Sequence, residues 1–153
     1  MTDTIRTGGC QCGAVRFRVS GETRRPSICH CRMCQKAFGG FFAPLADIGD
    51  AALEWTRGEP RRFQSSSHVQ RGFCAECGTP LTYEAPDGVA LAIGAFDDPA
   101  SLPPLIQFGT EDKLPFVDTL HRLPARTTGE DVAENPFLAD IQSYQHPDHD
   151  TVR

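Results

Sequence analysis

The sequence lacks an apolar segment that approaches the roughly 20 residues needed to cross a bilayer, and residues 1–8 lack the apolar stretch of a secretory signal. It also lacks an excess of basic residues. The net charge of −5 argues against a general nucleic-acid binder, because such proteins need a basic footprint. We therefore expect a cytoplasmic protein with neither a membrane nor a nucleic acid as its partner. The composition leaves the oligomeric state open.

Long amphipathic helices are missing as well, so strands must supply most of the core. Short alternating segments bounded by Gly, Pro and Asp predict these strands: Ala14–Val19, Phe41–Leu45, Leu53–Thr56, Pro80–Tyr83, Val89–Ile93 and Ile106–Phe108. The turn residues Pro86–Gly88 predict a hairpin, and Arg32–Ala37 is the best helical segment. The expected fold is mainly β, with several small antiparallel sheets.

At 153 residues the chain is long enough for one domain with a core and short for two. We expect the folded domain in residues 1–126 and a polar C-terminal extension in residues 127–153. The extension holds one short apolar cluster, Pro136–Leu138 with Ile141. We expect it to be a short helix or a mobile segment, fixed to the body only if this cluster finds a groove.

Seven cysteines are many for a reducing compartment, and an odd number cannot pair fully into disulfides. Their close spacing is typical of metal ligands. They fall into three groups, in the segments Cys10–Gly13, Cys29–Cys34 and Cys74–Thr79. Joining the first group to the third makes a closed four-cysteine zinc site of the structural kind, with ligands Cys10, Cys12, Cys74 and Cys77. The middle group then offers three thiolates and an open position, as catalytic zinc sites do: Cys29, Cys31 and Cys34.

Other interpretations of these cysteines remain open. The C-x-C pair of the first group and the C-x2-C pair of the third could be buried free thiols, or Cys31 and Cys34 could form a redox pair, although the βαβ context of such pairs is absent. A histidine could close the middle group and make it structural, the candidates being His30, His68 and His121. We expect the side chain of His30, which stands between two ligands, to point away from a shared ion.

The three cysteine segments, with Arg71–Leu81 around the last of them, closely resemble the glutathione-dependent formaldehyde-activating enzyme family, which includes the centromere protein V domain. Leu53–Gly58 and Gly94–Pro99 support the resemblance, which covers Gly9 to about Leu123. It implies a β-tent fold of several coiled sheets pinned by the four-cysteine zinc. It also implies a second, catalytic zinc on the middle group, and reversible carbon–sulfur lyase chemistry between glutathione and formaldehyde. Where family members carry a tryptophan, this chain has Phe116.

The resulting hypothesis is a lyase with two zinc ions per chain that acts on a small thiol and an aldehyde. A thiolate substrate beside three cysteine thiolates needs nearby cations, and Arg32, Lys36 and Arg71 are the candidates. The run Phe38–Phe42 is expected either to wall a substrate or to form a turn and a core strand. The alternatives are a non-enzymatic zinc-stabilised interaction module and a thiol-based metal or redox sensor.

Overall fold

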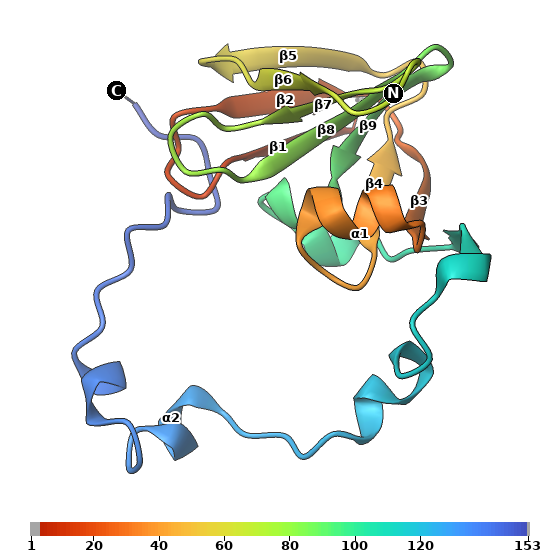
Figure 1. Cartoon of the computed structure of the whole chain (residues 1–153). Coiled ribbons are helices and arrows are strands. Elements are labelled where there is room, and N and C mark those ends of the chain that lie inside the picture. Colours follow the sequence, from red (N-terminus) through yellow and green to blue (C-terminus); the bar gives the residue numbers. More distant parts are fainter. Residues whose placement is uncertain (1–3, 153) are drawn as a thin grey trace.

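A computed structural model of the chain describes residues 4–152 and shows a mainly β protein with two open sheets and few helices (Figure 1). The strands are β1 (Ile5–Gly9), β2 (Arg16–Ser20), β3 (Arg24–Cys29), β4 (Ala43–Asp47), β5 (Ala52–Arg57), β6 (Arg61–Gln64), β7 (Gln70–Phe73), β8 (Pro80–Ala85), β9 (Gly88–Ala92) and β10 (Ile106–Phe108). The α-helices are α1 (Arg32–Phe38) and α2 (Thr128–Asp131). Short 3-10 helices are η1 (Ile93–Ala95), η2 (Pro99–Ser101), η3 (Thr110–Asp112), η4 (Val117–Arg122) and η5 (Pro136–Ala139). None of the helices within residues 4–152 has the length and apolar character that a membrane span requires.

The smaller sheet is antiparallel, with the strand order β1-β2-β5. Alternation along β2 buries Phe17 and Val19 completely. The ring of Phe17 packs edge-on against Trp55 and Phe96, at centroid distances of 6.0 and 5.1 Å. Gly8 of β1 lies against this ring, and a Cβ there would come within 2.5 Å of Phe17 Cζ. The close approach of β1 therefore requires glycine at position 8.

The larger sheet has seven strands in the order β10-β3-β4-β9-β8-β7-β6. The predicted hairpin is confirmed: β8 and β9 pair with Ala85 opposite Gly88, so Pro86 and Asp87 form a two-residue turn. At the other edge, β10 pairs in parallel with β3, and Phe108 lies opposite Cys29. The chain thus forms two sheets where we expected several small ones, and one strand pair is parallel where we expected only antiparallel pairs.

The main core draws apolar side chains from both sheets and from η1. Its buried members are Cys10, Val15, Phe17, Val19, Ala46, Ile48, Cys74, Leu81, Leu91, Ala92, Ile93, Ala95, Phe96 and Leu102. A smaller cluster of Cys34, Ala43 and Leu45 forms where α1 packs against β4. Because cysteines belong to both clusters, the two cysteine groups rest on the packed interior.

Residues 113–144 leave the body after β10 and arc away from it (Figure 1). The helix α2 begins with a capping box, in which the Thr127 and Glu130 side chains each bond the other residue's backbone amide. The apolar cluster of this extension does not dock on the body, since Phe137 and Ile141 are 65% and 64% exposed. What attaches the extension is a polar segment, residues 145–151, which we call the strap.

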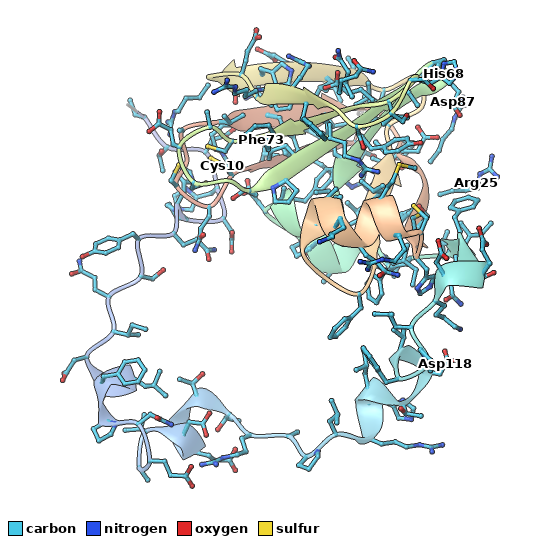
Figure 2. The ribbon with its side chains drawn as sticks, in the orientation of Figure 1. Cys10, Arg25, His68, Phe73, Asp87 and Asp118 are labelled. Carbon is cyan, nitrogen blue, oxygen red and sulfur yellow. The ribbon has the colours of Figure 1, made fainter. Side chains whose placement is uncertain are left out.

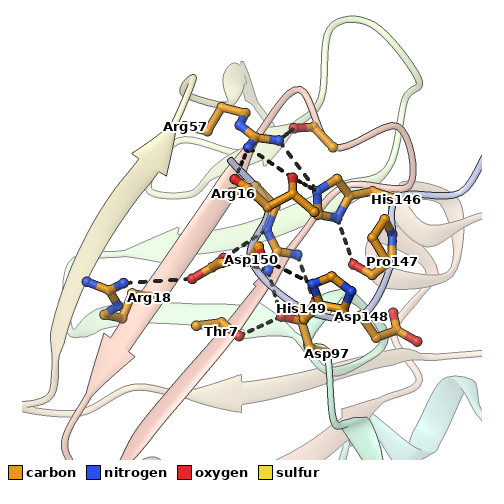
Figure 3. A network of polar contacts seen from close by, with 12 residues as sticks. Thr7, Arg16, Arg18, Arg57, Asp97, His146, Pro147, Asp148, His149 and Asp150 are labelled. Atoms are coloured by element: carbon orange, nitrogen blue, oxygen red, sulfur yellow. Dashed lines mark hydrogen bonds and ion pairs between the residues drawn. The ribbon is translucent and has the colours of Figure 1, made fainter. Parts of the chain in front are cut away.

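The strap returns to the smaller sheet beside the first cysteine segment (Figure 3). The amide of His146 donates to the Gln11 carbonyl at 2.7 Å, and Arg57 Nη2 donates to the Thr151 carbonyl at 2.7 Å. The imidazole of His146 also lies against Gly13, where a Cβ would approach it to 2.3 Å. Strand β5 and the Cys10–Gly13 turn therefore hold the strap by directed hydrogen bonds.

An ion cluster around Arg16 completes this attachment. Arg16 is 3% exposed, and its guanidinium forms two bonds to Asp97, of 2.8 and 2.6 Å. Asp150 of the strap accepts from the same guanidinium at 2.8 Å and lies 3.7 Å from Arg18. The two carboxylates raise the pKa of Arg16, so this buried side chain remains charged and paired.

Candidate functional site

The first and third cysteine segments meet at one end of the sheets, where Figure 2 shows Cys10 near Phe73. The Sγ atoms of Cys10, Cys12, Cys74 and Cys77 all lie within 4.8 Å of one another. Each pair occupies a tight turn directly after a strand. In these turns the amides of Gly13 and Gly78 donate to the carbonyls of Cys10 and Cys74, at 3.1 and 2.9 Å. Both glycines have positive φ, 78° and 79°, which explains their place in these turns.

The spacing of these four sulfurs fits a metal ion. Four thiolates about 2.3 Å from a central zinc, at the corners of a tetrahedron, are about 3.8 Å apart. The Sγ distances are 3.6 Å from Cys10 to Cys12 and 3.9 Å from Cys12 to Cys74. An all-sulfur donor set of this size suits zinc or another thiophilic metal.

Thr79 links the two turns. Its hydroxyl accepts from the Gln11 amide at 3.0 Å and is then free to donate to Cys77 Sγ at 3.2 Å. Burial opposes ionisation of Cys77, yet the hydrogen bonds from Thr79 and Cys12 outweigh it and lower its pKa to about 6. Cys77 thus favours the thiolate that a metal requires, whereas burial raises the pKa of Cys10 and Cys74.

The middle cysteine segment crosses from β3 to α1. Cys29 ends β3, Cys31 is the N-cap of α1 and accepts from the Cys34 amide at 3.4 Å, and Cys34 lies in the first helical turn. Their three Sγ atoms lie within 4.8 Å of one another. Burial raises the pKa of Cys29 to about 12 and also raises that of Cys34, so a cation is needed to hold these two as thiolates. Burial opposes ionisation of Cys31 as well, but hydrogen bonds and the charge of Arg71 lower its pKa.

Among residues 4–152, no further Cys, His, Asp or Glu joins these three sulfurs. His30 is buried with its Nε2 2.8 Å from Gln107 Oε1, and its ring packs edge-on against Phe42. His68 is exposed, and His121 belongs to η4, within residues 113–144 that arc away from the body. None of the three candidate histidines therefore stands with the group in this structure.

Arg71 is the one of the three expected cations for which the structure has a contact with this group. It is 7% exposed on β7, and its Nη2 lies 3.4 Å from Cys34 Sγ. Its Nε donates to Ser65 Oγ at 2.9 Å, and its guanidinium carbon lies 5.2 Å from the centre of the Tyr83 ring. Arg32 instead bonds Gln35, and Lys36 is exposed.

The three cysteines line a pocket of about 360 Å³. Arg71, Tyr83, Leu45 and Val89 contribute to its inner wall, and exposed residues at its edge include Arg25 and Asp87, which Figure 2 labels on the side of the molecule opposite Cys10. The pocket is large enough for a small peptide-like or thiol ligand. Spacing along the sequence did not identify Tyr83 or Arg25, because strands that pair across long intervals bring them here.

The Phe38–Phe42 run does not line this pocket. Gly39 ends α1 with a φ of 60°, Phe42 packs on His30, and Phe41 stacks edge-on against Phe116 at 5.1 Å. The run therefore forms a helix end and a turn, and the aromatic residues at the pocket are Tyr83 and Phe108.

Comparisons with known proteins agree with this arrangement. A family model described as glutathione-dependent formaldehyde-activating enzyme matches residues 5–112. A Halomonas elongata protein whose name carries the same description is 34% identical over 82 residues, which cover 48% of this chain and 52% of that protein. An uncharacterized lyase of Schizosaccharomyces pombe is 27% identical over 81 residues, 53% of this chain and 58% of the lyase. The chain thus spans little more than half of these relatives.

Among solved structures, a Rhodobacter sphaeroides protein matches with a TM-score of 0.50 and 23% sequence identity. The match covers 66% of this chain and 98% of that protein. At this identity the likeness concerns the fold alone.

Proposed function

Since the chain belongs to the glutathione-dependent formaldehyde-activating enzyme family, we propose that it is a zinc-dependent carbon–sulfur lyase. It would join a glutathione-like thiol and a small aldehyde such as formaldehyde, reversibly, into an S-hydroxymethyl adduct. The observation that carries this proposal is the group Cys29, Cys31 and Cys34 in the wall of a 360 Å³ pocket. Three protein ligands leave one position for substrate, as in catalytic zinc sites.

In this proposal two zinc ions bind per chain. The four-cysteine group holds a structural ion, and the three-cysteine group holds the second ion. A zinc ion in the second group supplies Lewis acidity and lowers the pKa of a nearby thiol. In the addition, the thiol sulfur bonds to the aldehyde carbon, and the carbonyl electron pair moves to its oxygen. That oxygen finally takes the proton that the thiol has lost.

The residues of the chain prepare the pocket for this addition. Arg71 lies 3.4 Å from Cys34 Sγ and offsets the negative charge that thiolates and a thiol substrate bring together. Because Arg71 is held by Ser65 and Tyr83, its charge is fixed in place before substrate arrives. Leu45 and Val89 make part of the inner wall apolar.

The test combines metal analysis with turnover. Formaldehyde adds to thiols without a catalyst, so exchange of ¹³C-formaldehyde with glutathione is followed by NMR with and without protein. We expect about two zinc ions in the parent chain and about one in Cys31→Ser, since that variant loses one ligand of the open group. The exchange should return to the uncatalysed rate while the circular dichroism spectrum stays unchanged.

Full catalysed exchange in Cys31→Ser would contradict this proposal. If the parent chain gives no exchange above background but captures a protein or nucleic acid, the non-enzymatic interaction module is the better interpretation.

A further inference from the structure

Strand β3 contains a backbone irregularity at the edge of the pocket. Its pairing with β4 shifts register between Arg24 and Ser27. Within that bulge, Arg25 has a φ of 29°, and it is the one non-glycine residue with positive φ among residues 4–152. The position costs conformational free energy for any residue with a Cβ. Pro26 follows, and a residue before proline is normally confined to extended backbone.

The bulge changes where the arginine side chain lies. In a regular strand, neighbouring residues point to opposite faces, and bulges near sites commonly redirect a side chain. Here Arg24 pairs with Asp50, and its side chain lies over Gly49. Arg25 instead lines the pocket that contains the three cysteines, and Figure 2 shows it at that side of the molecule. Strained backbone positions cluster at functional sites, so this one indicates that the Arg25 side chain has a function at the pocket edge.

The charges around the pocket leave Arg25 available for a ligand. Within residues 4–152 it takes part in no ion pair and no side-chain hydrogen bond, whereas Arg71 is engaged with Cys34, Ser65 and Tyr83. Asp47 and Asp87 line the same pocket, and Asp47 already accepts from the Gly49 amide at 2.7 Å. Among the described residues that line the pocket, Arg25 is therefore the cation that has no partner, and its guanidinium is exposed.

We infer that Arg25 is a specificity-determining residue that binds a carboxylate of the thiol substrate. The inference rests on the proposed function and deepens it. With its carboxylate on Arg25, a thiol directs its sulfur toward Cys29, Cys31 and Cys34 on the inner wall of the same pocket. A guanidinium recognises a carboxylate with two parallel hydrogen bonds, so the contact fixes orientation as well as affinity. A thiol without a carboxylate gains nothing from it.

The experiment compares N-acetylcysteine with N-acetylcysteine amide, which differ only in the carboxylate. Arg25→Gln removes the charge but keeps a side chain. We expect the KM for N-acetylcysteine to rise about five- to tenfold, as for one partly exposed charge-assisted contact, with kcat changed less than twofold. The KM for the amide should not change. The preference for the acid should also shrink at high salt.

Arg24→Gln is the matched control, because it removes the same charge one residue away, outside the pocket. It should change neither KM. Arg25→Gly should raise the melting temperature, since glycine relieves the positive φ. It should raise the KM for N-acetylcysteine as much as Arg25→Gln does.

Calorimetric binding of both thiols to the zinc-loaded protein separates this inference from the proposed function. If the acid binds more tightly than the amide and Arg25→Gln abolishes the difference, the inference stands even when no thiol is turned over. Equal effects of Arg25→Gln on both thiols, or no effect on either, would overturn it.

Discussion

Removing the carboxylate of Asp97 should destabilise the smaller sheet strongly. Arg16 is 3% exposed, and Asp97 supplies two of its hydrogen bonds, at 2.8 and 2.6 Å. In Asp97→Asn the buried guanidinium keeps only the half-exposed Asp150 as a carboxylate partner. Removing one member of a buried ion pair costs about 3–5 kcal/mol, and we expect about 3 kcal/mol because Asp150 remains. Urea unfolding followed by the fluorescence of Trp55, the single tryptophan, measures this change.

Asp150→Asn is the control for this prediction. It removes a carboxylate from the same guanidinium, but the Asp150 side chain is 41% exposed. Its loss should therefore cost about 1 kcal/mol or less. If the two variants lose equal free energy of unfolding, or if Asp97→Asn loses less than about 1 kcal/mol, then burial does not control the strength of this cluster.

The pH dependence of the same contact has a definite sign. Burial raises the pKa of Asp97, but the hydrogen bonds and charge of Arg16 outweigh burial and hold the pKa below its usual value. A carboxyl whose folded pKa is lowered stabilises the protein above its unfolded pKa of about 3.9, and this stabilisation is lost as the pH falls through the folded value. The difference in free energy of unfolding between the parent chain and Asp97→Asn should thus be constant at neutral pH and shrink below roughly pH 4.

Substitutions at three other positions test single contacts. Gly8→Ala should cost about 1–3 kcal/mol by overpacking, because its Cβ would lie 2.5 Å from Phe17 Cζ; an unchanged urea midpoint would contradict this. Thr79→Val should speed zinc release to a chromogenic chelator, since it removes the hydroxyl that joins the two turns; equal release rates would show that the hydroxyl is dispensable. Arg71→Met should lower the affinity of the three-cysteine group for zinc about 10- to 100-fold in chelator competition, and Arg71→Lys should have an intermediate effect. An unchanged affinity would exclude a role of Arg71 in offsetting charge.

The grouping of the cysteines illustrates how much of the candidate site could be predicted from the sequence. Pairs such as Cys74 and Cys77 are held by local turn geometry, with Gly78 at positive φ, so their convergence follows from a few neighbouring residues. The β8–β9 hairpin is local in the same sense, and its turn residues identified it. Whether metal occupies either group stays a prediction, as do the catalytic role of the middle group and the division of the chain at residue 126.

Features that depend on distant partners could not be predicted in this way. Strand β3 is interrupted by Arg25 and Pro26, so it shows no period-two pattern. The parallel pairing of β10 depends on a crossover that leaves no local sign in Ile106–Phe108. The C-terminal extension was expected to dock, if at all, by its apolar cluster, but polar residues of the strap make the contacts, and their partners are more than 80 residues away.

The position of the strap in the sequence determines when Arg16 gains its partners during translation. Asp97 follows Arg16 by 81 residues, and Asp150 follows it by 134. At about 5–20 residues per second, Asp150 is added roughly 7 to 27 s after Arg16. The smaller sheet must therefore pass through a nascent stage in which Arg16 has at most one acidic partner, and the strap contacts the Cys10–Gly13 turn only after residues 145–151 have been added. Docking of the strap is not needed for a metal ion to reach the four-cysteine group, because Cys12 and Cys77 remain exposed in the folded chain.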